Sequence, residues 1–144
     1  MGKVFLSLKF MYNMERFATQ IYRTQRKAFA EKEIADRLKA AADNEQQHVN
    51  DLKARIVELK GSPSWLGFLF QMAGRAVGFI TRIFGKLTIL KADVWVEQRA
   101  IKDYGFFLNK VEFDEKTRAM IKKIIIDEEG HVSTWQNSIE MLKA

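Results

Sequence analysis

The sequence predicts an all-α protein: an antiparallel four-helix bundle with an additional apolar helical segment between the two helix pairs. Its 144 residues include one proline and eight glycines, so few residues interrupt helices. Apolar residues make up 47% of the chain and recur at intervals of three and four. This length suits a single domain, residues 1–144, built around one core.

The first helix pair is expected within residues 1–60. One helix is predicted from about Val4 to Ala30 and a second from about Glu31 to Lys60, each with an apolar stripe at helical spacing. Gly61 stands where a helix would stop. Ser62-Pro63 is typical of a cap and first turn, so a further helix should follow.

The connection over residues 62–90 is unusually apolar. From Trp65 to Leu90 it is rich in Phe, Leu, Ile and Gly, and its polar residues fall roughly on one face: Gln71, Arg75, Arg82 and Lys86. Three cations interrupt the stretch, which argues against a membrane-spanning helix. The pattern indicates an amphipathic, basic segment.

The second helix pair is expected over residues 91–144. One helix is predicted from about Lys91 to Lys110, and the last begins near Asp114, a suitable cap, and continues almost to Ala144. Because their connection is short, these two helices should be antiparallel neighbours.

Composition excludes several kinds of chemistry. The chain has no cysteine, which rules out disulfides, thiolate metal sites, iron–sulfur clusters and cysteine nucleophiles. Any redox reaction would therefore need an external electron donor. The formal charge of +6 is spread without a dense basic run, so we expect no nucleic-acid binding. The first residues lack the features of a signal peptide, and we expect a cytoplasmic protein.

Both histidines of the chain share one motif. Each has a glutamate three positions before it, in Glu45-Gln-Gln-His48 and in Glu128-Glu-Gly-His131. This spacing places both side chains of a pair on one helix face. Both pairs also lie within apolar stripes, where ionisable groups are costly unless their charge is compensated. A bound metal ion is the simplest compensation.

The motif belongs to a duplicated unit. Glu15 precedes Glu45 by 30 residues and Glu97 precedes Glu128 by 31, so a glutamate helix is twice followed by a Glu-x-x-His helix. Four carboxylates balance two divalent ions, and carboxylate with imidazole suits iron or manganese. This is the ligand set of ferritin-like di-metal bundles. The sequence predicts two metal ions, iron or alternatively manganese, held by Glu15, Glu45, His48, Glu97, Glu128 and His131. The competing interpretation is ordinary surface glutamates and core histidines.

Two further pairs of residues repeat between the halves. Asn44 and Asp127 each precede the motif glutamate and could orient the imidazole of the opposite half, or lie in solvent. Tyr22 and Tyr104 each follow a ligand glutamate by seven residues. They are candidate catalytic residues that could bond the ligands, line a substrate cavity or pass electrons, with core packing as the alternative.

Five sequence motifs, taken in order along the chain, resemble those of a known protein family. They are Glu15-Arg-Phe-Ala-Thr-Gln-Ile-Tyr22-Arg-Thr-Gln25, Glu45-Gln-Gln-His48, Ser62-Pro63-Ser64-Trp65-Leu66 followed by Gly74, Gly78 and Gly85, Val96-Glu97-Gln-Arg-Ala-Ile101-Lys-Asp-Tyr104, and Asp127-Glu128-Glu129-Gly-His131. In this order they resemble the demethoxyubiquinone hydroxylase family over nearly the whole chain. The sequence departs from the family pattern at Gly67, at Lys102-Asp103 and at Gly105-Phe106-Phe107, around the expected substrate cavity.

The resemblance implies a di-iron monooxygenase that activates O₂ and hydroxylates a polyprenyl quinone at a membrane surface. The protein would then be peripheral on the inner face of an anionic membrane. The membrane and substrate contacts would come from the connecting segment: Trp65, Phe68, Phe70, Arg75, Phe79 and Arg82. The same segment could instead pack on the bundle or form a homodimer interface.

Three other functions use the same six ligands. A rubrerythrin-like protein would reduce peroxide or oxygen, although the chain lacks an internal electron donor. A ferritin-like protein would oxidise or store iron, although a net basic chain attracts iron poorly. The metals could also be purely structural.

Overall fold

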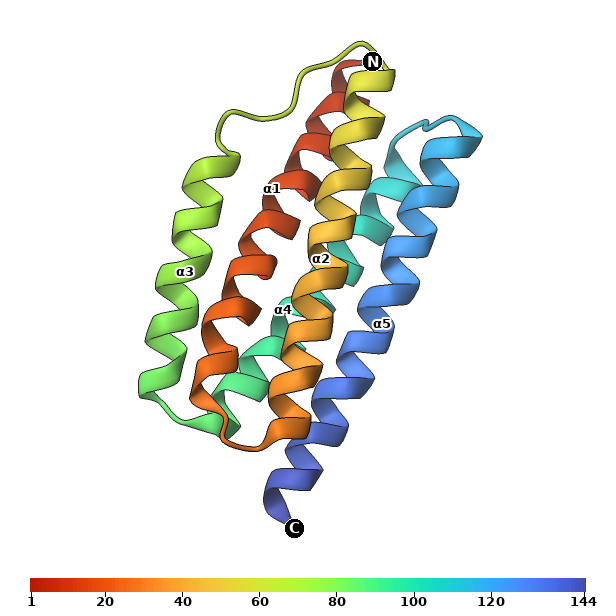
Figure 1. Cartoon of the computed structure of the whole chain (residues 1–144). Coiled ribbons are helices and arrows are strands. Elements are labelled where there is room, and N and C mark those ends of the chain that lie inside the picture. The colour runs from red at the N-terminus through yellow and green to blue at the C-terminus, as the bar shows by residue number, and fades with distance from the viewer.

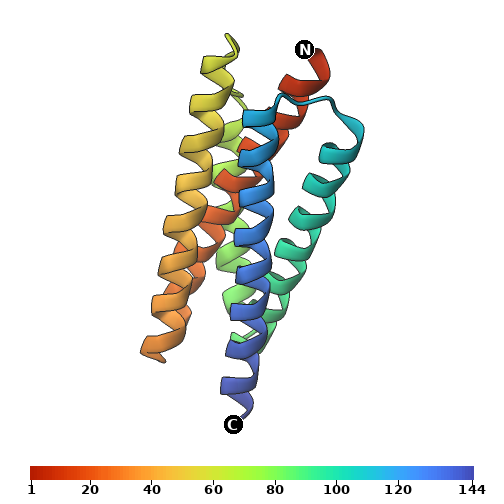
Figure 2. The ribbon, with the colours of Figure 1, turned by 90° about the vertical axis from the view of Figure 1, so that its right-hand side faces the viewer.

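The computed structural model describes all 144 residues and contains helices only. The helices are α1 (Gly2–Gln25), α2 (Lys32–Glu58), α3 (Gly67–Ile83), α4 (Lys86–Lys110) and α5 (Glu115–Lys143), with a 3₁₀ turn at Arg26–Ala28. The four long helices α1, α2, α4 and α5 form an antiparallel bundle, and α3 lies outside it along α1 (Figures 1 and 2). The predicted bundle with its additional segment is confirmed.

The path of the chain explains the extra helix. α2 ends at the same end of the bundle as the N-terminus, whereas α4 begins at the opposite end (Figure 1). α3 carries the chain back along the bundle, so α4 can run antiparallel to its neighbours α1 and α5. A two-helix repeat of this orientation needs such a crossover.

α2 ends through a backbone motif at Lys60. This residue has a φ of 65°, and the next amide, Gly61 N–H, donates to the carbonyl of Ile56 at 2.9 Å. The motif satisfies a carbonyl at the end of the helix. A Cβ added at Gly61 would lie 2.3 Å from the Phe5 ring, so a larger residue here would have to displace that side chain.

The connection between the helix pairs differs from the predicted one. The sequence predicted one segment up to Leu90, but α3 ends at Ile83 and α4 begins at Lys86. Gly85 stands between them with φ +91° and ψ 163°, a conformation open essentially to glycine alone. Lys86 therefore does not share a helix with the other polar residues of the segment. It pairs instead with Glu31 at 2.7 Å.

α3 packs against α1 at backbone distance. A Cβ added at Gly74 would lie 2.3 Å from the carbonyl oxygen of Phe17, and one at Gly78 would lie 2.9 Å from that of Ile21. Glycine is thus needed for this close contact. The opposite side of α3 and the residues that flank the helix carry exposed apolar side chains, here called the α3 apolar face: Trp65, Phe68, Leu69, Met72, Phe79, Ile80, Ile83 and Phe84.

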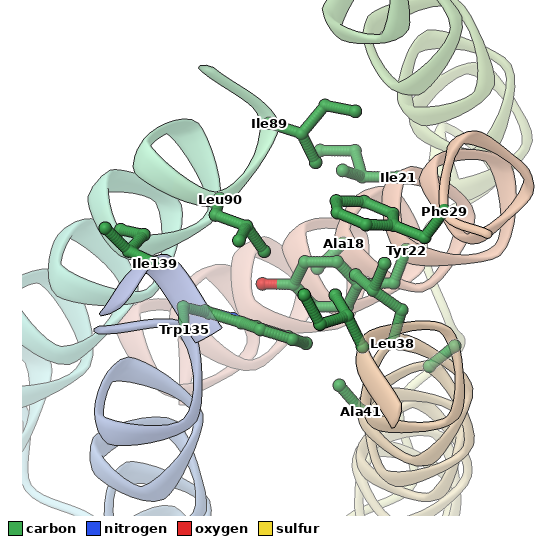
Figure 3. Close-up of a cluster of buried hydrophobic side chains, with 12 residues drawn as sticks. Ala18, Ile21, Tyr22, Phe29, Leu38, Ala41, Ile89, Leu90, Trp135 and Ile139 are labelled. Carbon is green, nitrogen blue, oxygen red and sulfur yellow. The ribbon is translucent and has the colours of Figure 1, made fainter. Parts of the chain in front are cut away.

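The core has two apolar clusters. One contains Tyr22, Leu38 and Trp135 (Figure 3), and the other contains Leu8 and Leu52. The buried glutamates and His48 belong to neither cluster. No helix of the structure combines the length and the apolar character needed to cross a bilayer.

Candidate metal centre

The six predicted ligand side chains meet inside the bundle. α1 provides Glu15, α4 provides Glu97, and α2 and α5 each provide a glutamate and a histidine from one face. Five of the six residues are no more than 1% exposed, and the His131 side chain is 13% exposed. Helical spacing fixes each Glu-x-x-His pair, and packing of four helices brings the pairs together.

The ligand atoms form two groups that share two residues. One group is Glu15, Glu45, His48 and Glu128, and the other is Glu45, Glu97, Glu128 and His131. Within each group the ligand atoms lie within 4.8 Å of one another. Glu45 and Glu128 belong to both groups, which is the position of bridging carboxylates. Each group then has one terminal carboxylate and one imidazole of its own.

The orientation of these atoms fits a pair of cations. His131 Nδ1 lies 3.0 Å from Glu45 Oε1, and His48 Nδ1 lies 3.3 Å from Glu128 Oε1. Neither carboxylate oxygen has a partner in hydrogen-bond geometry, and neither does Glu97 Oε2. A buried carboxylate oxygen without a partner is costly. Three carboxylate oxygens without partners, converging with two imidazole nitrogens, form a donor set that suits metal ions.

The charges of the ligands also call for cations. Burial and the neighbouring Glu15 raise the pKa of Glu45 well above its usual value, and burial and Glu45 do the same for the pKa of Glu128. Although burial opposes it, hydrogen bonds with Glu45 and His48 hold the pKa of Glu15 below its usual value. In the absence of metal the cluster therefore retains protons, which metal binding would displace.

The two tyrosines connect the halves crosswise. The Tyr22 hydroxyl donates to Oε1 of Glu97, and the Tyr104 hydroxyl donates to Oε1 of Glu15. Each tyrosine thus bonds the terminal glutamate of the other half rather than the one seven residues before it. Burial, and then the facing Glu97 or Glu15, raise the pKa of Tyr22 and Tyr104 well above 10, so both hydroxyls are neutral donors.

Asp127 holds His48 from the outside of the cluster. Its Oδ2 lies 2.9 Å from His48 Nε2 and 2.7 Å from Lys123 Nζ. Burial opposes ionisation of Asp127, yet Lys123 and His48 lower its pKa to about 2. Because an ionised carboxylate only accepts, Nε2 carries a proton, and Nδ1 is the nitrogen that faces the glutamates at 3.1–3.3 Å. Although burial opposes it, the glutamates raise the pKa of His48, so a metal ion would have to displace the proton of Nδ1.

Asn44 does not repeat this role. Its Nδ2 donates to Asp127 Oδ2 at 3.5 Å, and no hydrogen bond joins it to His131. His131 is bonded only through Nδ1, to Glu97 at 3.1 Å. The two halves are therefore unequal: His48 is fixed at both nitrogens, whereas His131 is partly open to solvent.

Sequence reasoning missed Asp93, a buried acid near the centre. It is 0% exposed, and neither carboxyl oxygen has a partner in hydrogen-bond geometry. The Gln25 amide lies beside it, and burial raises the pKa of Asp93 well above its usual value. The available signal was its position one turn before Glu97, on the same helix face.

Sequence reasoning also missed an apolar groove beside the centre. A cavity of about 230 Å³ between α1 and α4 is lined by Phe10, Met14, Phe17, Trp95, Val96, Arg99 and Asp103. Met14 and Val96 directly precede the terminal glutamates of the two halves. The residues that line the groove come from two helices about 80 positions apart in the sequence, so no local motif predicted it.

The six residues expected at a membrane or substrate divide into two sets. Trp65, Phe68 and Phe79 are 81%, 60% and 59% exposed and lie on the α3 apolar face. Arg75 is also exposed, although its Nε donates to Gln20 at 3.1 Å. Phe70 and Arg82 are partly buried.

Comparison with known proteins decides the family. The family model described as "Ubiquinone biosynthesis protein COQ7" matches residues 13–142. The chain belongs to the COQ7 family. This confirms the resemblance found in the sequence motifs, and the match includes all six candidate ligands of the COQ7-family chain.

Curated relatives carry one name. The 3-demethoxyubiquinol 3-hydroxylase of Nitrosospira multiformis is 30% identical over 118 residues, covering 81% of this chain and 57% of the relative. That of Dechloromonas aromatica is 27% identical over the same shares. That of Ectopseudomonas mendocina is 30% identical over 103 residues, 71% of this chain and 48% of the relative. The chain thus spans about half the length of the curated relatives it matches.

A solved structure supports the fold. A dodecameric thioferritin from Bacteroides fragilis, described as bacterioferritin-related, matches with a TM-score of 0.64 over 94% of this chain and 88% of its own. At 17% identity the likeness extends to the fold alone. It confirms the prediction of a ferritin-like bundle.

Proposed function

We propose that this chain is a di-iron monooxygenase that uses O₂ to hydroxylate a quinone-like substrate. The observation that carries the proposal is the pair of buried ligand groups sharing Glu45 and Glu128. Membership of the COQ7 family and relatives named as hydroxylases support it. The donor set suits iron or manganese, and iron is the metal proposed because the hydroxylation depends on O₂.

Each ligand has a proposed role. Glu15 and His48 would hold one ion, Glu97 and His131 the other, and the two shared glutamates would bridge them. When bound, the ions supply O₂ activation. Tyr22 and Tyr104 hold the terminal carboxylates by donating to them, and we assign them a positioning role.

The groove between α1 and α4 is the proposed substrate entrance. Phe10, Met14 and Phe17 give it an apolar wall, and Trp95, 64% exposed, lies on α4. A quinone ring with an apolar tail matches such a lining. Arg99 and Asp103 are the polar groups available to orient ring oxygens.

The α3 apolar face is the proposed membrane contact. Its large side chains are at least half exposed, which is unusual for a helix facing water alone. Arg75 and Arg82 would lie at the level of anionic head groups. The protein would then be peripheral on a membrane that supplies its substrate, with electrons coming from an external donor.

Metal analysis and turnover test the catalytic proposal. Purified protein is expected to bind about two iron ions per chain, consistent with two ligand groups. Glu128→Ala and His131→Ala should remove most of the metal, whereas Glu129→Ala, an exposed neighbour, should retain it. Reduced protein with O₂ and a demethoxyquinol should give hydroxylated product. Loss of peroxide without hydroxylation would contradict the monooxygenase assignment.

Vesicle flotation tests the membrane contact. The protein should float with anionic vesicles, and Phe68→Ser/Phe79→Ser should remain in the aqueous fraction. If the same variant instead converts a dimer to a monomer in sedimentation and wild-type protein never floats, the face is a homodimer interface.

A further inference from the structure

A polar groove lies on the other side of α1 from the apolar entrance. Its volume is about 290 Å³, and residues of α1, α2 and α3 line it. α2 and α3 flank α1 along this side of the molecule (Figure 1). Three lining residues are cations, Arg16, Arg23 and Lys53, and none is acidic.

Neutral groups are the hydrogen-bond partners of the two arginines, and they hold Arg16 more closely than Arg23. Arg16 Nη1 donates to the Tyr12 hydroxyl at 3.0 Å, and its Nη2 donates to Gln71 Oε1 at 2.5 Å. Arg23 Nη2 donates to Gln46 Oε1 at 3.4 Å. Uncharged acceptors orient a guanidinium without cancelling its charge, and each arginine retains free N–H donors.

The groove also lacks compensating charge. No carboxylate forms an ion pair with Arg16, Arg23 or Lys53, which are among the fifteen of 24 lysines and arginines without one. Three positive charges that line one cavity repel each other. An anion bound among them would relieve this repulsion and meet several oriented donors at once.

We propose that this groove binds the phosphate group of an anionic ligand. Guanidinium forks match phosphate oxygens, and Lys53 adds a mobile point charge. The cavity can hold a phosphate together with part of the group it esterifies. Gln71, which lines the groove from α3, lies on a helix whose far side is the α3 apolar face. A soluble phosphate ester and a phospholipid head group both present this chemistry; the site is independent of the metal centre and of the proposed reaction.

An NMR titration of the full chain tests the proposal. Inorganic phosphate and glycerol 3-phosphate are expected to shift amide signals of groove residues saturably. Arg23→Gln/Lys53→Gln changes two exposed side chains, so the fold should survive, and it should weaken binding by about tenfold or more. Lys91→Gln/Lys122→Gln removes the same charge from α4 and α5 and should leave binding unchanged.

Flotation of the same variants distinguishes the two sources of phosphate. If Arg23→Gln/Lys53→Gln also reduces binding to phosphatidylglycerol vesicles, and the control does not, the ligand is a lipid head group. If vesicle binding is unaffected while phosphate binding is lost, the ligand is a soluble phosphate ester. Absence of saturable shifts in the groove, or equal losses in the control variant, would overturn the proposal whatever the metal content or activity.

Discussion

Single side chains make the two halves of the candidate metal centre unequal. His48 is held at both ring nitrogens, with ionised Asp127 on the outer one, whereas His131 has no partner on its outer nitrogen. Asp127→Asn keeps the shape but removes the charged acceptor. We expect it to weaken metal binding by about 10–100-fold, the usual cost of losing such a partner. Competition between the protein and a chelator for Mn²⁺ measures the metal affinity. Asp36→Asn, at an exposed position of α2, is the control. Equal affinities in the two variants would remove Asp127 from the site.

Asp93 should make stability depend on pH in a definite direction. Because its pKa is raised in the folded protein, its carboxyl stays protonated there while the unfolded chain already ionises. Stability is therefore fully present below the ordinary pKa of an aspartate and is lost as pH rises toward the raised value. A folded-state pKa that lies one pH unit above the unfolded-state pKa corresponds to a loss of about 1.4 kcal/mol.

The isosteric variant Asp93→Asn removes this dependence. Its free energy of unfolding, relative to wild type, should rise with pH above about 4, where a free aspartate ionises, and level off above the raised pKa. Urea unfolding of both proteins across a pH series provides the measurement. A difference that stays constant with pH would mean that Asp93 is ionised in the folded state.

At the scale of helices, the local sequence pattern predicted which helices exist better than it predicted where each helix begins and ends. The apolar period gave four long helices, and Asp114 caps α5 by accepting from Thr117 N–H at 2.9 Å. The break at Gly85 was missed because both sides of it are equally apolar. What marks the boundary is a backbone conformation, not a change in composition.

Replacing glycine by alanine should lower the stability at the α1–α3 contact and raise it on the open side of α4. Gly74→Ala would place a methyl group 2.3 Å from the Phe17 carbonyl oxygen, and neither backbone can move cheaply. We expect a loss of about 1–3 kcal/mol. Gly105→Ala on α4 meets nothing within 4 Å and should gain about 0.5–1 kcal/mol, as alanine is the better helix former. Thermal unfolding of both variants checks the pair; destabilisation of equal size would refute the close contact.

For the molecule as a whole, the duplicated motif was enough to predict that six side chains, from four helices, meet at one site. Helical spacing and the repeat of about 30 residues were enough, since ligands on the inner faces of four helices must meet. The crosswise bonds of Tyr22 and Tyr104 were beyond reach, because they depend on how the two halves pack. Asp93 and the two grooves were missed for the same reason: their surroundings come from helices distant in sequence.

The isosteric change Glu128→Gln should raise the melting temperature of the metal-free protein and lower that of the metal-bound protein. In metal-free protein, Glu128 lies buried beside other carboxyl groups, and burial and Glu45 raise its pKa. Near neutral pH the unfolded chain ionises this group while the folded protein keeps it protonated, which costs stability. Glu128→Gln is neutral in both states and removes this cost, so it should raise the melting temperature near neutral pH by a few degrees, at about 3 °C per kcal/mol. In wild type, saturating metal should add about 3 kcal/mol at a hundredfold excess over Kd.

The glutamine variant, lacking a bridging charge, should lose most of that metal-dependent gain. Calorimetry with Mn²⁺ and with chelator therefore gives four melting temperatures whose order is fixed in advance: the variant above wild type without metal, and below it with metal. Glu129→Gln, on the exposed side of α5, should follow wild type in both conditions. A variant that melts lower than wild type in both would make Glu128 an ordinary packing residue, because a purely structural role has the same sign with and without metal.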